Sequence, residues 1–218
     1  MKKIISVLIL ALSLLNAKSF EESKKELAML YDSLGSAYQY DFYCNAPFKA
    51  NKKGKYTKFE VVKSDLYTPR NEYTKKGKIN QRAKRIEWEH IMPAQNFGRK
   101  EGGRKACQND PLFTKMEADK QNLVPAIGEI NGDRSNFRYA EAPTNLKYTQ
   151  YGNCKVYTDF KAKRFYPANY SKGWIARSYL YMSKTYNIRL SDQERKLMEA
   201  WDKQYPIDEK EKRIRELL

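Results

Sequence analysis

Residues 87–93 read Glu87-Trp88-Glu89-His90-Ile91-Met92-Pro93 and contain the only histidine of the chain. Adjacent residues of an extended chain point to opposite sides, so Glu89 and His90 suit two separate roles better than joint binding of one ion. A neutral imidazole can take a proton from water near pH 7, and a carboxylate suits a hard cation such as Mg²⁺. The alternative is a structural histidine that only makes hydrogen bonds, so this stretch alone leaves catalysis open.

A second polar cluster follows in residues 122–137, which contain several Asn, Asp and Glu side chains as oxygen donors. Gly128 and Gly132 lie among them and permit close approach of the backbone. The alternative is a turn followed by a helix, with Asn131 or Asp133 as its cap. The cluster is therefore a candidate metal or substrate site that the spacing alone does not settle.

Positive charge is concentrated in one part of the chain. The 218 residues include 42 Lys and Arg against 26 Asp and Glu, a formal net charge of +16. Residues 51–105 alone carry 16 basic and 6 acidic side chains, a net charge of +10, around His90. In the same region, Gly102-Gly103-Arg104-Lys105 offers a guanidinium that can hold a phosphate through two hydrogen bonds. This pattern favours a nucleic-acid partner over an anionic membrane; a solvated basic face is the alternative.

The first 17 residues have the features of a secretory signal peptide. Two lysines precede a mostly apolar stretch over residues 4–15, and Ala17 suits the position before cleavage. The stretch is too short to span a bilayer, although a retained anchor is the alternative. We therefore expect residues 18–218 to form an exported, soluble protein in the periplasm or outside the cell.

Local patterns predict a mixture of helices and strands. A capping box of Ser19 and Glu22 begins a helix over residues 19–31, and residues 42–80 read as irregular β structure. The other predicted elements are a strand over residues 59–66 and helices over residues 111–121, 172–186 and 191–206. The charged tail from residue 208 is expected to form a solvated helix. Because neither an internal repeat nor a low-complexity linker occurs, a single α+β domain is the simplest architecture.

Four stretches, in this order, closely resemble the endonuclease I family of periplasmic and secreted bacterial nucleases. They are Glu87-Trp-Glu-His-Ile-Met-Pro-Ala-Gln-Asn-Phe-Gly98, Gly102-Gly-Arg-Lys-Ala-Cys107, Met116-Glu-Ala-Asp-Lys-Gln-Asn-Leu123 and Gly128-Glu-Ile-Asn-Gly-Asp-Arg-Ser-Asn-Phe137. Residues 172–206 also resemble the C-terminal helices of that family. The resemblance implies a ββα-metal nuclease fold that cuts DNA, and also RNA, with little sequence preference and with one Mg²⁺ per active site.

The resemblance also implies a role for each matching residue. His90 corresponds to the general base, Glu89 and Asn131 to the metal ligands, and Arg104 to the catalytic, phosphate-binding arginine. Asn131 is preferred over Asn136 because it lies nine residues after the asparagine at position 122, at the head of the Gly-Asp-Arg-Ser-Asn run.

Two further substrate contacts and one disulfide complete the expected site. Lys105 and Arg134 are expected to bind substrate beside the catalytic arginine. An exported chain permits one disulfide among three cysteines, and the sequence alone allows three pairings. The resemblance favours Cys107 with Cys154 and leaves Cys44 without an evident partner. Three Cys and one His are too few and too scattered for a structural zinc site.

These residues predict a monomeric hydrolase that cuts single- and double-stranded DNA and leaves 5′-phosphate ends. The competing function is a secreted basic nucleic-acid-binding protein without catalysis, which explains the charge equally well. It does not explain the joint occurrence of the candidate base, metal ligands and arginine. A hydrolase of cell-wall polymers would need a separated pair of acids in a cleft, and the sequence gives no reason to prefer it.

Overall fold

A ββα unit lies at the centre of the computed structural model, which describes residues 18–52, 57–98 and 104–218. Strand β3 (Ile86–His90) pairs antiparallel with β4 (Leu123–Ile127), and α5 (Gly128–Arg134) follows β4 directly. Every residue of β4 is buried, so this strand is covered on both faces. The expected α+β class and ββα unit are both present.

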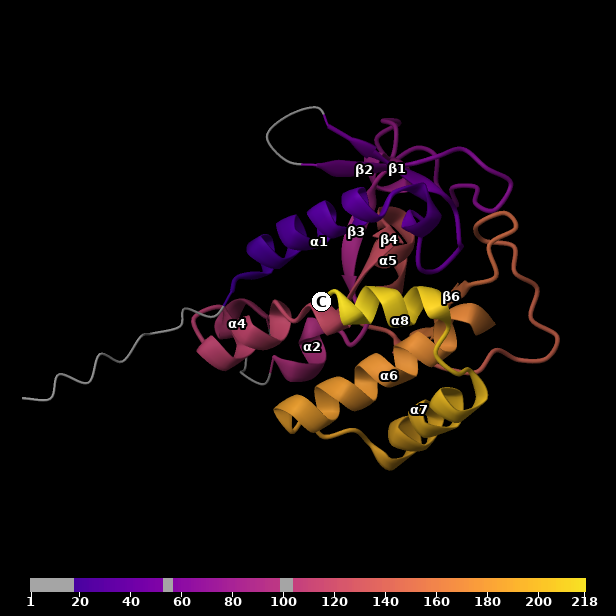
Figure 1. Ribbon diagram of the computed structural model, residues 1–218. Coiled ribbons are helices and arrows are strands. Elements are labelled where there is room, and N and C mark those ends of the chain that lie inside the picture. Colours follow the sequence, from indigo (N-terminus) through magenta and orange to yellow (C-terminus); the bar gives the residue numbers. More distant parts are fainter. Residues whose placement is uncertain (1–17, 53–56, 99–103) are drawn as a thin grey trace, which may run out of the picture.

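The ββα unit lies between two groups of elements (Figure 1). On one side are α1 (Phe20–Leu34) and the antiparallel pair β1 (Phe48–Asn51) and β2 (Lys58–Val61); on the other are α6 (Asn169–Tyr186) and α7 (Asp192–Gln204). The remaining elements are η1 (Ser36–Tyr38), η2 (Gln81–Lys84), α2 (Ala94–Phe97), α3 (Arg104–Cys107), α4 (Pro111–Glu117), η3 (Lys120–Asn122), α8 (Glu209–Glu216) and a sheet of order β5-β7-β6, formed by Arg138–Tyr139, Arg164–Tyr166 and Tyr157–Asp159.

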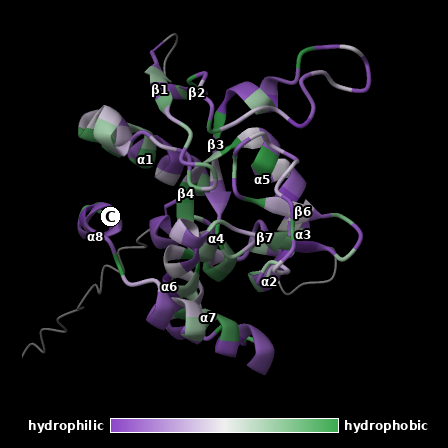
Figure 2. Ribbon diagram, turned by 90° about the vertical axis from the view of Figure 1, so that its right-hand side faces the viewer, coloured by the Kyte–Doolittle hydropathy of each residue, from purple (hydrophilic) through white to green (hydrophobic). Residues whose placement is uncertain are grey.

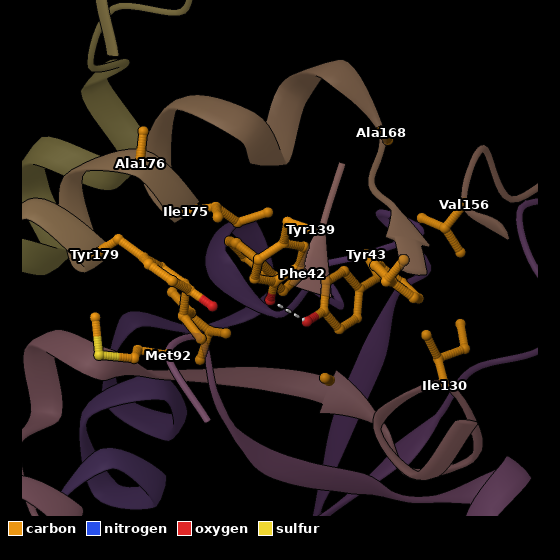
Figure 3. Packing of buried hydrophobic residues seen from close by; sticks show 14 of the residues in the cluster. Phe42, Tyr43, Met92, Ile130, Tyr139, Val156, Ala168, Ile175, Ala176 and Tyr179 are labelled. Carbon is orange, nitrogen blue, oxygen red and sulfur yellow. Dashed lines mark hydrogen bonds between the residues drawn. The ribbon is translucent and has the colours of Figure 1, made fainter. Parts of the chain in front are cut away.

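The main core fills the space between the ββα unit and α6. Ile175 and Tyr179 of α6 share this core with Ile130 of α5, and Figure 3 shows the rings of Tyr43 and Tyr139 between them. The hydroxyl groups of Tyr43 and Tyr139 form a hydrogen bond inside this core, with their oxygens 2.7 Å apart. A smaller apolar cluster lies under α1, whose buried side chains pack on β1 and β2. The two clusters hold β3 and β4 between them and fix the position of the central unit.

Helix starts follow the local capping signals. The capping box of Ser19 and Glu22 is formed at the start of α1, and Asp110 caps α4 through the backbone N–H groups of residues 112 and 113. Helix α4 ends at Glu117, four residues before its predicted end, because Asp119 caps a new 3₁₀ turn. The predicted strand over residues 59–66 is shorter, since β2 ends at Val61.

The C-terminal helix α8 is more deeply embedded than its charge suggests. Its residues are largely hydrophilic (Figure 2), yet Glu211 and Ile214 are buried. The Glu211 carboxylate accepts hydrogen bonds from Arg177 Nε at 2.8 Å and from Arg215 Nε at 2.6 Å. The predicted helix from residue 208 is present, but it is not solvated on every side, because paired charges allow its Glu211 and Ile214 face to pack against the rest of the protein.

The disulfide joins Cys44 to Cys154, with the two Cα atoms 4.8 Å apart, while Cys107 is a buried free thiol. The expected pairing of Cys107 with Cys154 is wrong. A turn held by Asp41, which accepts hydrogen bonds from the backbone N–H groups of residues 43 and 44, presents Cys44 to the segment that contains Cys154. Cys107 instead points from α3 into the main core.

Within the described ranges, no helix combines the length and the apolar composition that a membrane crossing needs. The proposed signal peptide, residues 1–17, lies outside the described residues.

Candidate active site

A cleft of about 1260 Å³ opens beside β3 and contains the candidate catalytic residues. Helix α1 forms one wall, and Glu89 and His90 of β3 meet Asn131 of α5 in the lining. The lining also includes five basic side chains, Lys24, Lys25, Lys58, Arg82 and Arg85, against three acidic ones, Glu21, Glu87 and Glu89. The cleft is therefore basic and suits an anionic ligand.

His90 is held in one orientation by the backbone of α4. Its Nε2 lies 2.8 Å from the carbonyl oxygen of Glu117, and its ring packs on Phe20 of α1 at 4.7 Å between centroids. Because a carbonyl oxygen can only accept a hydrogen bond, Nε2 carries the proton, and Nδ1 of the neutral ring is then the acceptor. This tautomer is the one that can remove a proton from water through Nδ1.

Glu89 points to the opposite side of β3 and is 4% exposed. Its Oε1 accepts hydrogen bonds from the Tyr43 hydroxyl at 2.9 Å and from Arg134 Nη1 at 3.0 Å. Burial raises the pKa of the Glu89 carboxyl to about 7, while the Arg134 charge and the Tyr43 hydroxyl lower it. Both contacts fall on Oε1, so Oε2 has no hydrogen-bond partner among the described residues, and Glu89 belongs to the lining of the cleft.

Asn131 lies inside α5, whose N-terminal cap is Ile127, so the alternative role of Asn131 or Asp133 as a cap is wrong. The Asn131 Nδ2 group donates to Glu87 Oε2 at 3.2 Å. Since a carboxylate only accepts hydrogen bonds, this contact turns Nδ2 toward Glu87 and leaves Oδ1 as the amide atom that faces away from Glu87. Glu89 and Asn131 thus bring one carboxylate and one amide oxygen to the same cleft, a donor set that fits a hard cation.

The family model for Endonuclease I matches residues 19–216. The chain belongs to the endonuclease I family. Its relatives include an extracellular and a periplasmic deoxyribonuclease of Aeromonas hydrophila, each 44% identical over 88% of this chain and over 80% and 77% of their own length. Endonuclease-1 of Buchnera aphidicola subsp. Acyrthosiphon pisum is 50% identical over 60% of this chain and 53% of its own. As a member of the endonuclease I family, the chain is an enzyme of the nuclease class.

In this family member, Arg134 has a different place from the one expected. It is 1% exposed, and besides Glu89 it donates to the backbone carbonyl oxygens of His90 at 3.0 Å and Ile91 at 2.7 Å. Its guanidinium lies over the Tyr139 ring, 4.5 Å from the centroid. A side chain enclosed in this way cannot reach a phosphate, so the prediction that Arg134 binds substrate is wrong.

The other two expected substrate contacts lie on α3. Arg104 begins this helix, and its side chain is outside the described part of the structure, so its phosphate contact stays a prediction. Lys105 is exposed and is not among the described residues that line the cleft. Within the described ranges no group of three or more His, Cys, Asp and Glu side chains could hold a metal ion.

The sequence interpretation missed Glu87, Arg82 and Arg85, which form an ion-pair cluster beside Asn131. The Glu87 carboxylate accepts from Arg82 Nη2 and from Arg85 Nη2, each at 2.6 Å. A signal was available, because Glu87 lies two residues before Glu89 in the same strand and therefore on the same face. Tyr43 and Phe20 gave no such signal, since they come from segments far from β3 in the sequence.

Proposed function

We propose that the chain is an exported, Mg²⁺-dependent endonuclease that hydrolyses phosphodiester bonds of DNA with little sequence preference. The observation that carries the proposal is the meeting of His90, Glu89 and Asn131 in one basic cleft. The printed names of its relatives, deoxyribonuclease and endonuclease, support DNA as the substrate. Because lysines and arginines contact phosphates whatever the base, the cleft also suits RNA and both strand forms.

His90 acts as the general base in this proposal. The Glu117 carbonyl oxygen keeps the proton on Nε2, so Nδ1 is the ring nitrogen that takes the proton of the water that attacks phosphorus. The ring of Phe20 packs on the imidazole and limits its rotation. Attack in line expels the 3′ oxygen, which takes up a proton from solvent water to become a hydroxyl group, and leaves 5′-phosphate ends.

Glu89 and Asn131 would hold one Mg²⁺, which supplies neutralisation of the charge that develops on the phosphate and the leaving oxygen. Their contacts with Arg134, Tyr43 and Glu87 hold the two side chains in place before an ion arrives. With one protein carboxylate among the ligands, the ion would keep several water molecules. Arg104 would hold the non-bridging phosphate oxygens.

One gel assay separates this enzyme from the competing binding protein without catalysis. The purified chain is incubated with supercoiled plasmid in Mg²⁺ or in EDTA, and nicked and linear products are followed. We expect cleavage in Mg²⁺ only, and His90→Ala should reduce it about 10²–10⁴-fold while DNA binding is kept. Binding to plasmid without cleavage in Mg²⁺ would support the competing function, and normal turnover of His90→Ala would reject the base.

The metal ligands have a matched control in the same segment. Asn131→Ala should lose activity or require much more Mg²⁺, whereas Asn136→Ala changes an exposed asparagine five residues later and should behave as the wild type. Equal activity of both variants would remove Asn131 from the ligand set.

The proposed export divides the chain into a signal peptide, residues 1–17, and a nuclease domain, residues 18–218. The extracellular and periplasmic relatives support this division. N-terminal sequencing of the mature protein should begin at Lys18, and size-exclusion chromatography should give a monomer. A mature chain that starts at Met1 would reject the signal peptide.

A further inference from the structure

Each proposed metal ligand is held through one atom only. On Glu89, both hydrogen bonds reach Oε1, and on Asn131, the bond to Glu87 uses Nδ2. These contacts leave Oε2 of Glu89 and Oδ1 of Asn131 as the oxygens that the described contacts do not use, and both residues line the cleft. The surroundings of the two side chains differ, however. Glu89 is buried, whereas Asn131 is held by one carboxylate at the wall of the cleft.

A carboxamide is ambiguous as a metal ligand, because its oxygen can bind a cation and its NH₂ group cannot. Rotation by 180° about the last bond of the side chain exchanges the two. A carboxylate next to the amide removes this ambiguity, since it accepts a hydrogen bond from NH₂ and repels the amide oxygen. Glu87 stands in that position beside Asn131, with Nδ2 and Oε2 3.2 Å apart.

Glu87 is itself fixed from several directions. Arg82 donates to it through Nε at 3.0 Å and Nη2 at 2.6 Å, and Arg85 donates through Nε at 2.9 Å and Nη2 at 2.6 Å. The Glu87 side chain is 20% exposed, while those of Arg82 and Arg85 are 44% and 53% exposed, so solvent screens the arginine side of each pair. Two cations on one carboxylate make a rigid acceptor for the Asn131 amide.

Helix α5 is shaped to admit this cluster. A methyl group at Gly128 would lie 2.8 Å from Glu87 Cδ, and one at Gly132 would lie 2.3 Å from Arg82 Nη1. The two glycines are four residues apart and therefore share one face of the helix, next to Asn131. Any larger side chain at either position would displace the Glu87–Arg82 pair, so the helix surface and the ion pair fit each other.

We propose that Glu87 is a positioning residue that orients the Asn131 amide with its oxygen toward the metal. Arg82 and Arg85 hold Glu87 in place for this task. The role rests on the proposed function, because it presupposes that Asn131 is a metal ligand. It deepens that function by stating which way Glu87 turns the Asn131 amide.

The test is Mn²⁺ binding to the full-length mature protein without DNA, measured by electron paramagnetic resonance. Glu87→Gln replaces the pure acceptor by an amide, whose NH₂ group can pair with Asn131 Oδ1 and turn it from the cleft. Loss of an outer partner of a metal ligand typically weakens the metal affinity about 10–100-fold, and we expect a decrease of that order. DNA affinity in EDTA should change little by comparison.

The matched control is Asp133→Asn on the same helix. Asp133 also pairs with an arginine through two bonds, from Arg70 Nε at 2.9 Å and Nη2 at 2.8 Å, but it does not line the cleft. Both variants remove the negative charge of a carboxylate that pairs with arginine; Asp133 lies in α5, and Glu87 contacts α5 through Asn131. Asp133→Asn should keep the Mn²⁺ affinity of the wild type, so a general loosening of α5 cannot account for a selective loss in Glu87→Gln.

The side-chain amide of Asn131 gives a second measurement that does not depend on the metal. Its ¹⁵N-resolved NH₂ resonances should shift in Glu87→Gln and stay in place in Asp133→Asn. Equal Mn²⁺ affinity in Glu87→Gln and the wild type, with unchanged Asn131 resonances, overturns the role of Glu87. If the wild type itself binds no Mn²⁺, the ligand set of the proposed function is wrong and the inference falls with it.

Discussion

Replacement of Arg134 by methionine should destabilise the fold far more than replacement of any exposed arginine. Methionine keeps an unbranched apolar chain but removes the guanidinium, which contacts Glu89 and the backbone carbonyl oxygens of His90 and Ile91. The Glu89 carboxylate would stay buried with only the Tyr43 hydroxyl as a donor. Arg134→Met therefore breaks a buried ion pair at its most enclosed point.

The expected loss follows from the degree of burial. Side-chain exposure is 1% for Arg134 and 4% for Glu89, and removal of one partner of such a pair costs about 3–5 kcal/mol of unfolding free energy. Domains have about 5–15 kcal/mol in total, so the variant should fold but with a small margin. For a chain of this length the midpoint should fall by roughly 6–20 °C, at about 2–4 °C per kcal/mol.

Thermal and urea unfolding of wild type, Arg134→Met and Arg70→Met measures the difference. Arg70 also contacts a residue of the α5 region through two bonds, to Asp133, but its side chain is 32% exposed. An exposed pair contributes about 0–1 kcal/mol, so Arg70→Met should lose little. Equal losses in the two variants would refute the argument from burial.

A double variant isolates the charge from the packing. In Glu89→Gln/Arg134→Met the buried carboxylate is replaced by a neutral amide that the Tyr43 hydroxyl can still contact. The double variant should therefore recover part of the loss of Arg134→Met, with a coupling energy of about 0.5–3 kcal/mol. If instead the two single losses simply add, the uncompensated charge is not the cause of the destabilisation.

Three further predictions concern the disulfide, α5 and the substrate. Reduction of the Cys44–Cys154 disulfide, which closes a loop of 110 residues, should lower the free energy of unfolding by about 4–5 kcal/mol through chain entropy. Thermal unfolding with and without reductant measures this loss. Cys107→Ser should leave the difference unchanged. Gly128→Ala should cost about 1–3 kcal/mol in urea unfolding, because the methyl group overlaps Glu87; a stabilised variant would contradict the overlap. The logarithm of DNA affinity should fall linearly with the logarithm of salt concentration, with a slope of about −0.9 per phosphate contact, and a flat titration would reject phosphate contacts.

Local signals predicted the parts of the fold that depend on neighbours in the sequence. The capping box at Ser19 and the cap at Asp110 are formed as expected, because each needs only a side chain and backbone N–H groups within three residues. The opposite directions of Glu89 and His90 follow in the same way from the alternation of a strand. These features need no knowledge of the rest of the chain.

Predictions about features that depend on distant segments of the chain were wrong or were not made. The partner of Cys154 is set by a turn around Asp41, more than a hundred residues away, and not by cysteine spacing. Arg134 lies in a polar run that reads as a surface, yet α5 turns it toward Glu89. Glu211 reads as a solvated charge until the arginine of α6 that pairs with it is known. In each case the sequence supplied the residue but not the partner that decides its role.

The net charge of a segment also differs from the charge that the segment brings to the cleft. Residues 51–105 carry a net +10, but Arg82 and Arg85 share the carboxylate of Glu87, so part of that charge is paired beside Asn131. Conversely, Lys24 and Lys25 line the cleft from α1, in a segment whose net charge is close to zero. The positive charge at the cleft therefore comes from several segments that the fold brings together, and, among the described residues, only part of the basic run near His90 is free of a carboxylate partner such as Glu87.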